Sequence, residues 1–207
     1  LALAALILPT VLANGWQALR SGVGVAVASV KKFGVFIVVM LVFIALSAQL
    51  VAGMSPQVFF LALGIPVTMM ASFQLSGWTF RIAPANRRKA DVVIGAIAGS
   101  LGGISGVWGP PTVAYLTAMD TPKTEQLRVQ GVVYGLGAVV LMISHIKSGI
   151  LDEVSAPLSA AMLLPALAGM AIGLWVHDRL DQQKFRSATL FVLVVAGLNL
   201  IRRGVFG

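Results

Sequence analysis

The chain has 207 residues, of which 58% are hydrophobic and only 11% are charged. A soluble domain carries about 25% charged residues, so this composition excludes a soluble globular protein and predicts that lipid solvates most of the chain. The net charge of +8 comes from cations in short connections between apolar runs, where they set membrane topology, so we expect a lipid partner and no nucleic acid.

Seven predicted elements follow one another along the chain, separated by charged residues, prolines and glycines. In order they are residues 2–19, 33–51, 57–78, 92–119, 129–145, 156–176 and 187–201. Most of them approach the ~20 apolar residues that a helix needs to cross a bilayer. The connection at 20–32 is predicted as a basic loop and the one at 120–128 as a polar loop. The sequence thus predicts an all-α polytopic membrane protein.

The element at 92–119 differs from the others because glycine and proline interrupt it. It reads Gly99-Ser-Leu-Gly102-Gly103-Ile-Ser105-Gly106-Val-Trp108-Gly109-Pro110-Pro111. Proline lacks the N–H group that a helix interior needs, and glycine weakens a helix. We predict two half-helices joined by a break, with the prolines in the first turn of the second. Alternatively, the glycines are close helix-packing positions, which fits Gly99 and Gly103 and extends to Gly106.

A weak internal repeat has an offset of 127 residues, from Arg20-Ser21-Gly22 to Lys147-Ser148-Gly149. The offset superimposes the first three elements on the last three. The predicted division is therefore a first repeat at 1–78, a basic cytoplasmic loop at 79–91 and a second repeat at 92–203. Only the second repeat opens with a Gly-rich element. By repeat symmetry we expect the natural protein to carry roughly 30 to 40 further N-terminal residues with a second broken segment.

The element at 92–119 either crosses the bilayer once or enters and returns on the same side. Re-entry places more of the lysines and arginines on the cytoplasmic side, which the positive-inside rule favours. It also gives the two repeats opposite orientations, as in many secondary transporters. We therefore predict inverted repeats with Gly/Pro-broken re-entrant helices.

The interrupted segment is also the best candidate for ligand binding. Non-helical backbone at membrane depth must be buried in protein or line a cavity. A helix that begins there directs free N–H groups and a partial positive charge at an anion, near the bilayer midplane. The predicted substrate-binding residues in this segment are Gly102, Gly103, Ser105, Gly106, Trp108, Gly109 and Pro110.

Polar residues of neighbouring spans complete the predicted cage for an oxyanion. They are Asn14, Gln17, Gln130 and Tyr134. Such residues more often bond to a neighbouring helix, and both interpretations stay open. No carboxylate lies near the middle of a predicted span, and no nucleophile–base pair, metal-ligand cluster or nucleotide loop occurs in the sequence. We therefore expect no enzyme, no cofactor and no metal; the absence of cysteine also excludes thiolate sites.

Two stretches resemble the sulfite exporter TauE/SafE family, also called the 4-toluene sulfonate uptake permeases. One is the Gly/Pro-rich run at 95–111, and the other extends from Pro165 to Gly197 and includes Asp178-Arg179-Leu180 and Phe185-Arg186. The resemblance covers the whole chain. Where members often have a third glycine, this chain has Trp108-Gly109-Pro110.

The resemblance implies a multi-pass transporter of sulfite, organosulfonates or related sulfur-containing anions in a bacterial inner membrane. Two alternatives stay open at this point: a transporter of a different organic anion, and a membrane scaffold that transports nothing. The sequence also leaves a homo-oligomer open.

Overall fold

The computed structural model describes residues 2–19, 22–51, 53–77, 81–147, 149, 153, 155–177 and 182–207, and most of these residues are helical. The helices are α1 (Ala2–Leu19), α2 (Val23–Lys32), α3 (Gly34–Val51), α4 (Pro56–Leu75), η1 (Pro84–Asn86), α5 (Arg87–Ser105), α6 (Gly109–Ala118), α7 (Lys123–Lys147), α8 (Ser155–Ala161), α9 (Leu163–His177) and α10 (Gln182–Phe206). The all-α prediction is confirmed, since no strand occurs in these ranges.

Four helices of the described chain are long and apolar enough to cross a membrane. They are α3, α4, residues 124–147 of α7 and residues 187–206 of α10. Two shorter apolar stretches, 5–19 and 155–169, accompany them. The chain is therefore a multi-pass membrane protein, as the composition predicted.

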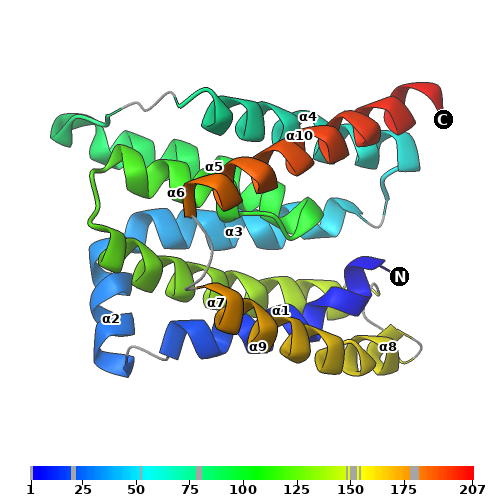
Figure 1. Ribbon diagram of the computed structural model, residues 1–207, viewed down its shortest axis with the longest axis horizontal. Helices are drawn as coiled ribbons and strands as arrows, with labels where there is room; N and C mark the ends of the chain where they lie inside the picture. The colour runs from blue at the N-terminus through cyan, green and yellow to red at the C-terminus, as the bar shows by residue number, and fades with distance from the viewer. Residues whose placement is uncertain are drawn as a thin grey trace.

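The helices lie in three layers (Figure 1). Helices α4 and α10 pack together in one outer layer, and α3, α5 and α6 form the middle layer. Helices α1 and α7 pack together in the other outer layer, where α1 also contacts α8 and α9. The short helix α2 runs across the ends of the other helices and contacts α7 and α3.

Glycines four residues apart on α5 form a close interface with α3. They are Gly95, Gly99 and Gly103, and they face the carbonyl oxygens of Phe36, Met40 and Ile44. A Cβ atom at any of the three glycines would lie within 3.0 Å of that oxygen, so no larger residue fits without a backbone shift. The close-packing interpretation thus holds for Gly99 and Gly103, and this interface fixes α5 in the middle layer.

Glycines also join the other two helix pairs. A Cβ at Gly131 of α7 would lie 2.8 Å from the carbonyl oxygen of Gln17 in α1. A Cβ at Gly64 of α4 would lie 2.8 Å from the carbonyl oxygen of Gly197 in α10. In both pairs the contacting positions run in opposite directions along the two helices, so the helices are antiparallel.

The predicted offset of 127 residues relates α1 to α7 and α4 to α10. A pseudo-two-fold axis that lies in the membrane plane and relates the two repeats would place such equivalent helices antiparallel to each other. The arrangement therefore supports the predicted inverted repeats, which stay a prediction.

Several boundaries differ from the sequence expectation. The predicted basic loop at 20–32 contains the helix α2, and α5 begins at Arg87, inside the predicted loop at 79–91. Helix α7 begins at Lys123, inside the predicted polar loop, and a turn at Met162 divides the sixth element into α8 and α9. In the first three cases charge density was taken as the mark of a loop, although charged residues are ordinary components of helix ends.

Helices α5 and α6 form a hairpin whose two ends meet on one side of the bundle. The Ile82 N–H donates a 2.9 Å hydrogen bond to the Ala118 carbonyl, which joins the segment before α5 to the end of α6. The predicted break is confirmed, but the two arms are unequal. Helix α5 has 19 residues, about 28 Å, and α6 has 10, about 15 Å. Only α6 is a half-helix, and re-entry into a bilayer stays a prediction.

Candidate anion site at the helix break

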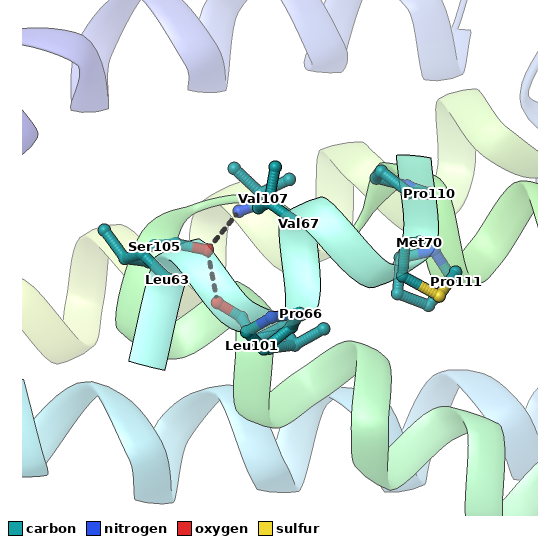
Figure 2. A pocket seen from close by; sticks show the side chains of 9 residues that line it. All are labelled: Leu63, Pro66, Val67, Met70, Leu101, Ser105, Val107, Pro110 and Pro111. Atoms are coloured by element: carbon teal, nitrogen blue, oxygen red, sulfur yellow. Dashed lines mark hydrogen bonds between the residues drawn. The ribbon is translucent and has the colours of Figure 1, made fainter. Parts of the chain in front are cut away.

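The break begins where glycine allows the chain to leave α5. Gly106 has a φ of 72°, a left-handed conformation that favours glycine, and its N–H donates to the Gly102 carbonyl at 2.7 Å. The Ser105 hydroxyl donates to the Leu101 carbonyl at 2.6 Å and accepts from the Val107 N–H at 3.1 Å (Figure 2). The N–H groups of Gly106 and Val107 are therefore already bonded within the protein.

The first turn of α6 leaves two N–H groups free. Pro110 and Pro111 have no N–H, and the N–H of Thr112 bonds to the Trp108 carbonyl at 3.2 Å. Within the described residues, the N–H groups of Trp108 and Gly109 have no hydrogen-bond partner in the protein. The donor set is thus narrower than predicted, because Gly102 and Gly103 lie inside α5, where helical hydrogen bonds occupy their N–H groups.

The Trp108 side chain anchors the start of α6 between two neighbouring helices. It is 3% exposed, and its indole covers Gly102, where a Cβ would lie 2.7 Å from Cε3. The ring centroids of Trp108 and Tyr134 are 6.5 Å apart. The Tyr134 hydroxyl donates a long, 3.4 Å hydrogen bond to the Gly109 carbonyl. Gly102 therefore gives room to the indole, and Tyr134 of α7 contacts the predicted site.

A narrow pocket opens beside the break, towards α4 (Figure 2). Its lining side chains nearly fill it, and the space left between them is about that of one water molecule. The hairpin contributes Leu101, Ser105, Val107, Pro110 and Pro111, and α4 contributes Leu63, Pro66, Val67 and Met70. Ser105 is the sole hydroxyl-bearing side chain among these residues, so the pocket offers an apolar wall beside a helix N-terminus.

The α4 wall was missed at the sequence level, although Pro66 was a usable signal. A proline inside a helix removes the hydrogen bond to the carbonyl four residues earlier, here that of Ala62. Helix α4 continues through Pro66 with one helical hydrogen bond fewer, and it faces the break of the α5–α6 hairpin across the pocket. Backbone groups without helical partners beside a pocket are typical of a ligand site in a membrane transporter.

Three predicted cage residues do not reach the break. Asn14 and Gln17 lie on α1, where their backbones pack against Gly135 and Gly131 of α7. Gln130 lies one turn before Tyr134 on α7. Among the described residues no hydrogen bond connects Asn14, Gln17 or Gln130 to the hairpin, so the structure does not assemble the cage that the sequence predicted.

A buried carboxylate closes the base of the hairpin. Asp91 was expected at the end of a loop, but it lies in α5, is 6% exposed and accepts a short hydrogen bond from the Tyr115 hydroxyl of α6. The Tyr115 ring is stacked on Phe36 with centroids 4.4 Å apart. An ionisable group buried in a membrane protein is rare and is often functional, so Asp91 belongs among the candidate residues.

The depth of the break follows from its neighbours on α3. Gly103 packs against the backbone of Ala48, whose N–H would lie 2.8 Å from a Cβ there, and α3 ends at Val51. The break therefore lies about one helical turn from the end of α3 rather than beside its middle.

Comparison with known proteins gives one match. The chain matches the family described as sulfite exporter TauE/SafE over residues 1–200. No curated protein and no solved structure matches it. Because the family match covers nearly all of the 207 residues, and because the helical membrane architecture and the broken helix agree with it, the chain belongs to the sulfite exporter TauE/SafE family.

Proposed function

We propose that this protein transports small sulfur-containing oxyanions and that the anion binds at the N-terminus of α6. The family itself suggests a membrane transporter of sulfite or related anions. The observation that carries the proposed site is the pair of N–H groups, from Trp108 and Gly109, that have no partner in the described protein. We also propose that the protein resides in a bacterial inner membrane, which the resemblance of its sequence to the family implies.

The start of α6 suits an anion for electrostatic reasons. A helix N-terminus carries a partial positive charge, and its first N–H groups point away from the helix. Two prolines follow Gly109, so the donors at the tip are confined to Trp108 and Gly109. The Ser105 hydroxyl borders the pocket and supplies a third donor if it turns from the Leu101 carbonyl. Three donors match the oxygens of a sulfite or sulfonate group.

The lining of the pocket bears on the class of anion. Leu63, Val67 and Met70 of α4 face the break with apolar side chains. When α4 moves away from the hairpin to admit a solute, an inorganic anion would leave this wall without favourable contacts, whereas the carbon substituent of an organosulfonate would bury apolar area against it. Within the sulfur-containing anions we therefore favour organosulfonates.

The position of the pocket suggests how transport proceeds. Helix α4 packs mainly against α10, and α5 packs mainly against α3. The pocket lies between these two pairs, where few contacts hold α4 to the hairpin. Rigid-body movement of one pair against the other would open the site to alternate sides, as in transporters built from repeats.

Serine substitutions provide a matched test of the site. Ser105 and Ser29 each donate from the hydroxyl to the carbonyl four residues earlier, but Ser29 lies in α2, away from the break. We expect Ser105→Ala to lower the apparent affinity for a sulfonate about tenfold, because a hydrogen bond to a charged group is lost. Ser29→Ala should change it less than twofold. The measurement is anion flux into proteoliposomes over a range of concentrations.

Anion flux, together with thermal unfolding in the presence of anions, separates the alternatives. Equal flux by the two variants would remove Ser105 and the break from the binding site. Uptake of carboxylates in preference to sulfite and sulfonates would indicate a transporter of another organic anion. A scaffold would show no flux and no dependence of its thermal unfolding on sulfite, thiosulfate, sulfonates or carboxylates.

A further inference from the structure

A second groove lies at the base of the hairpin, outside the pocket described above. It is a shallow groove bounded by the segment before η1 and by the first turns of α5, and most of its empty volume of ≈ 850 Å³ is open to the surroundings. The hydrogen bond from the Ile82 N–H to the Ala118 carbonyl fixes one wall of the groove to the end of α6. The groove is therefore a built feature of the hairpin.

The chemistry of the groove changes along its length. Arg81, Asn86 and Lys89 line one part with exposed polar side chains. Ala90 follows Lys89 directly, Val93 and Ile94 lie about one turn further along α5, and these three line the rest with apolar side chains. Val93 is 57% exposed, and Ile97, one turn beyond it, is also exposed. A polar mouth thus leads onto an apolar stripe directed along the bundle.

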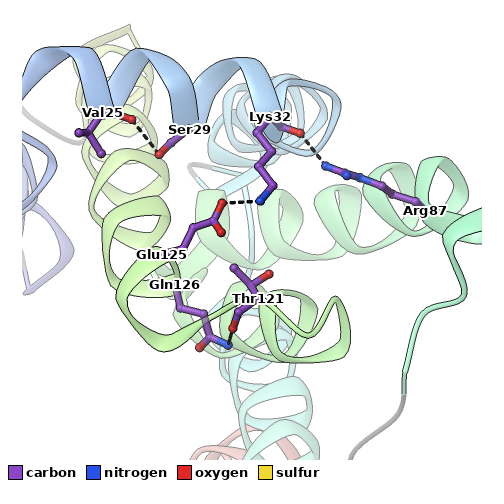
Figure 3. Close-up of polar contacts among 7 residues, drawn as sticks. All are labelled: Val25, Ser29, Lys32, Arg87, Thr121, Glu125 and Gln126. Atoms are coloured by element: carbon purple, nitrogen blue, oxygen red, sulfur yellow. Dashed lines mark hydrogen bonds and ion pairs between the residues drawn. The ribbon is translucent and has the colours of Figure 1, made fainter.

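The mouth keeps its positive charge because the nearby acids are occupied or weakly paired. Glu125 pairs with Lys32 at 2.6 Å (Figure 3), and the carboxylate of Asp91 is bonded to Tyr115. Asp120 lies 4.0 Å from Arg81, and both side chains are more than 80% exposed, so this pair is weak.

Arg87, by contrast, is not available to a ligand at the mouth. It donates to the Lys32 carbonyl at 2.7 Å (Figure 3) and lies over the Phe33 ring.

We propose that this groove binds an anionic phospholipid, with the phosphate between Arg81 and Lys89 and an acyl chain along Val93 and Ile97. Cationic side chains near a membrane surface attract anionic headgroups. The apolar stripe gives the acyl chain of the lipid a surface to pack on, which an inorganic anion could not use. A zwitterionic lipid fits the stripe but gains little from the two cations. The inference does not depend on which solute the protein transports.

The test measures lipid binding to the full chain in detergent micelles. A fluorescent phosphatidylglycerol is titrated against the protein, with the phosphatidylcholine analogue as reference. In the double variant Arg81→Gln/Lys89→Gln we expect about a 25-fold loss of affinity for phosphatidylglycerol, since each cation contributes about fivefold. The matched control is Arg202→Gln/Arg203→Gln, which removes two exposed cations at the end of α10 and should change the affinity less than twofold.

Three results would overturn the proposal. An equal loss in the two double variants would mean that surface charge alone attracts the lipid. Equal affinity for the two lipids in the unaltered protein would mean that the cations do not select the headgroup. Displacement of the lipid by inorganic phosphate or sulfite at matched concentration would assign the groove to a free anion. Thermal unfolding of each variant, expected to be unchanged because the side chains are exposed, confirms that the comparison is made between folded proteins.

Discussion

The two faces of α5 differ in how closely their neighbours approach. On one face Gly95, Gly99 and Gly103 bring the backbone of α3 so near that no Cβ fits between the helices. On the other face Leu101 and Ser105 line a pocket whose opposite wall is α4. One helix therefore combines a closed interface, which we call the α3–α5 seam, with an open boundary at which a ligand can bind and a neighbour can move.

The difference shows that a glycine-rich run has no single meaning. Gly103 and Gly106 are three residues apart, yet the first gives room to a neighbouring backbone and the second supplies a left-handed turn. What each glycine does depends on what lies beside it, which spacing alone does not reveal. The consequences for stability should therefore differ from glycine to glycine, and the following substitutions test this.

The largest effect is expected within the α3–α5 seam. Gly99→Ala places a Cβ 2.6 Å from the Cβ of Phe43 and against the backbone of Met40. We expect it to destabilise the protein by about 3 kcal/mol through overpacking. Gly15→Ala in α1 is the control: nothing lies within 4 Å of its Cβ, and alanine favours the helix by about 1 kcal/mol. Thermal unfolding in detergent measures both, and equal stability of the two variants would contradict the seam.

An intermediate effect is expected at the base of the hairpin. Tyr115→Phe removes the hydroxyl that bonds to the buried Asp91 carboxylate and should cost about 2 kcal/mol, because the carboxylate loses a partner. Tyr134→Phe at the tip removes only a 3.4 Å bond to the Gly109 carbonyl and should cost about 0.5 kcal/mol. These are the two tyrosines of the chain. A larger shift of the unfolding midpoint for Tyr134→Phe would show that the tip, not the base, holds the hairpin.

Among the glycine substitutions, the smaller loss is expected at the turn. Gly106→Ala has room, since the nearest atom to the new Cβ is Leu141 Cδ2 at 3.9 Å, but the left-handed backbone costs about 1 kcal/mol. Gly106→Asn should recover part of that loss, because asparagine tolerates this conformation. The pair is compared by chemical unfolding in detergent. A loss as large as that of Gly99→Ala, without recovery by asparagine, would make Gly106 a packing position instead.

Much of the fold could be predicted because its signals are local. Apolar length locates α3, α4 and α10, and the donor-free prolines after Gly109 locate the break to within a few residues. Helix α2 was missed because it is short, and its terminal Lys31 and Lys32 suggested a loop. Local sequence signals therefore located the long apolar helices but not the short helix α2, nor every helix boundary.

The candidate site was predictable only in part, because most of it depends on contacts between distant residues. The buried Asp91 pairs with Tyr115, 24 positions later, and nothing near Asp91 in the sequence indicates this. Asn14 and Gln17 were expected at the site because they are polar. Instead, their backbones pack against glycines of α7 in the α1–α7 interface. Pro66 marked α4 as a helix with a missing hydrogen bond, but that α4 faces the break follows from tertiary packing, which the proline alone does not indicate.

The α3–α5 seam is held by a force that differs from the one in soluble cores. Lipid chains are as apolar as the groups they surround, so joining the two helices releases no ordered water. What remains is the hydrogen bond that the Ser47 hydroxyl of α3 donates to the Gly99 carbonyl at 3.2 Å, contact between glycine Cα–H groups and the carbonyl oxygens of α3, and dispersion. Water-driven burial weakens on cooling, whereas these attractions do not. The scaffold that carries the hairpin should therefore stay joined in the cold, with its cohesion independent of the entropy of water.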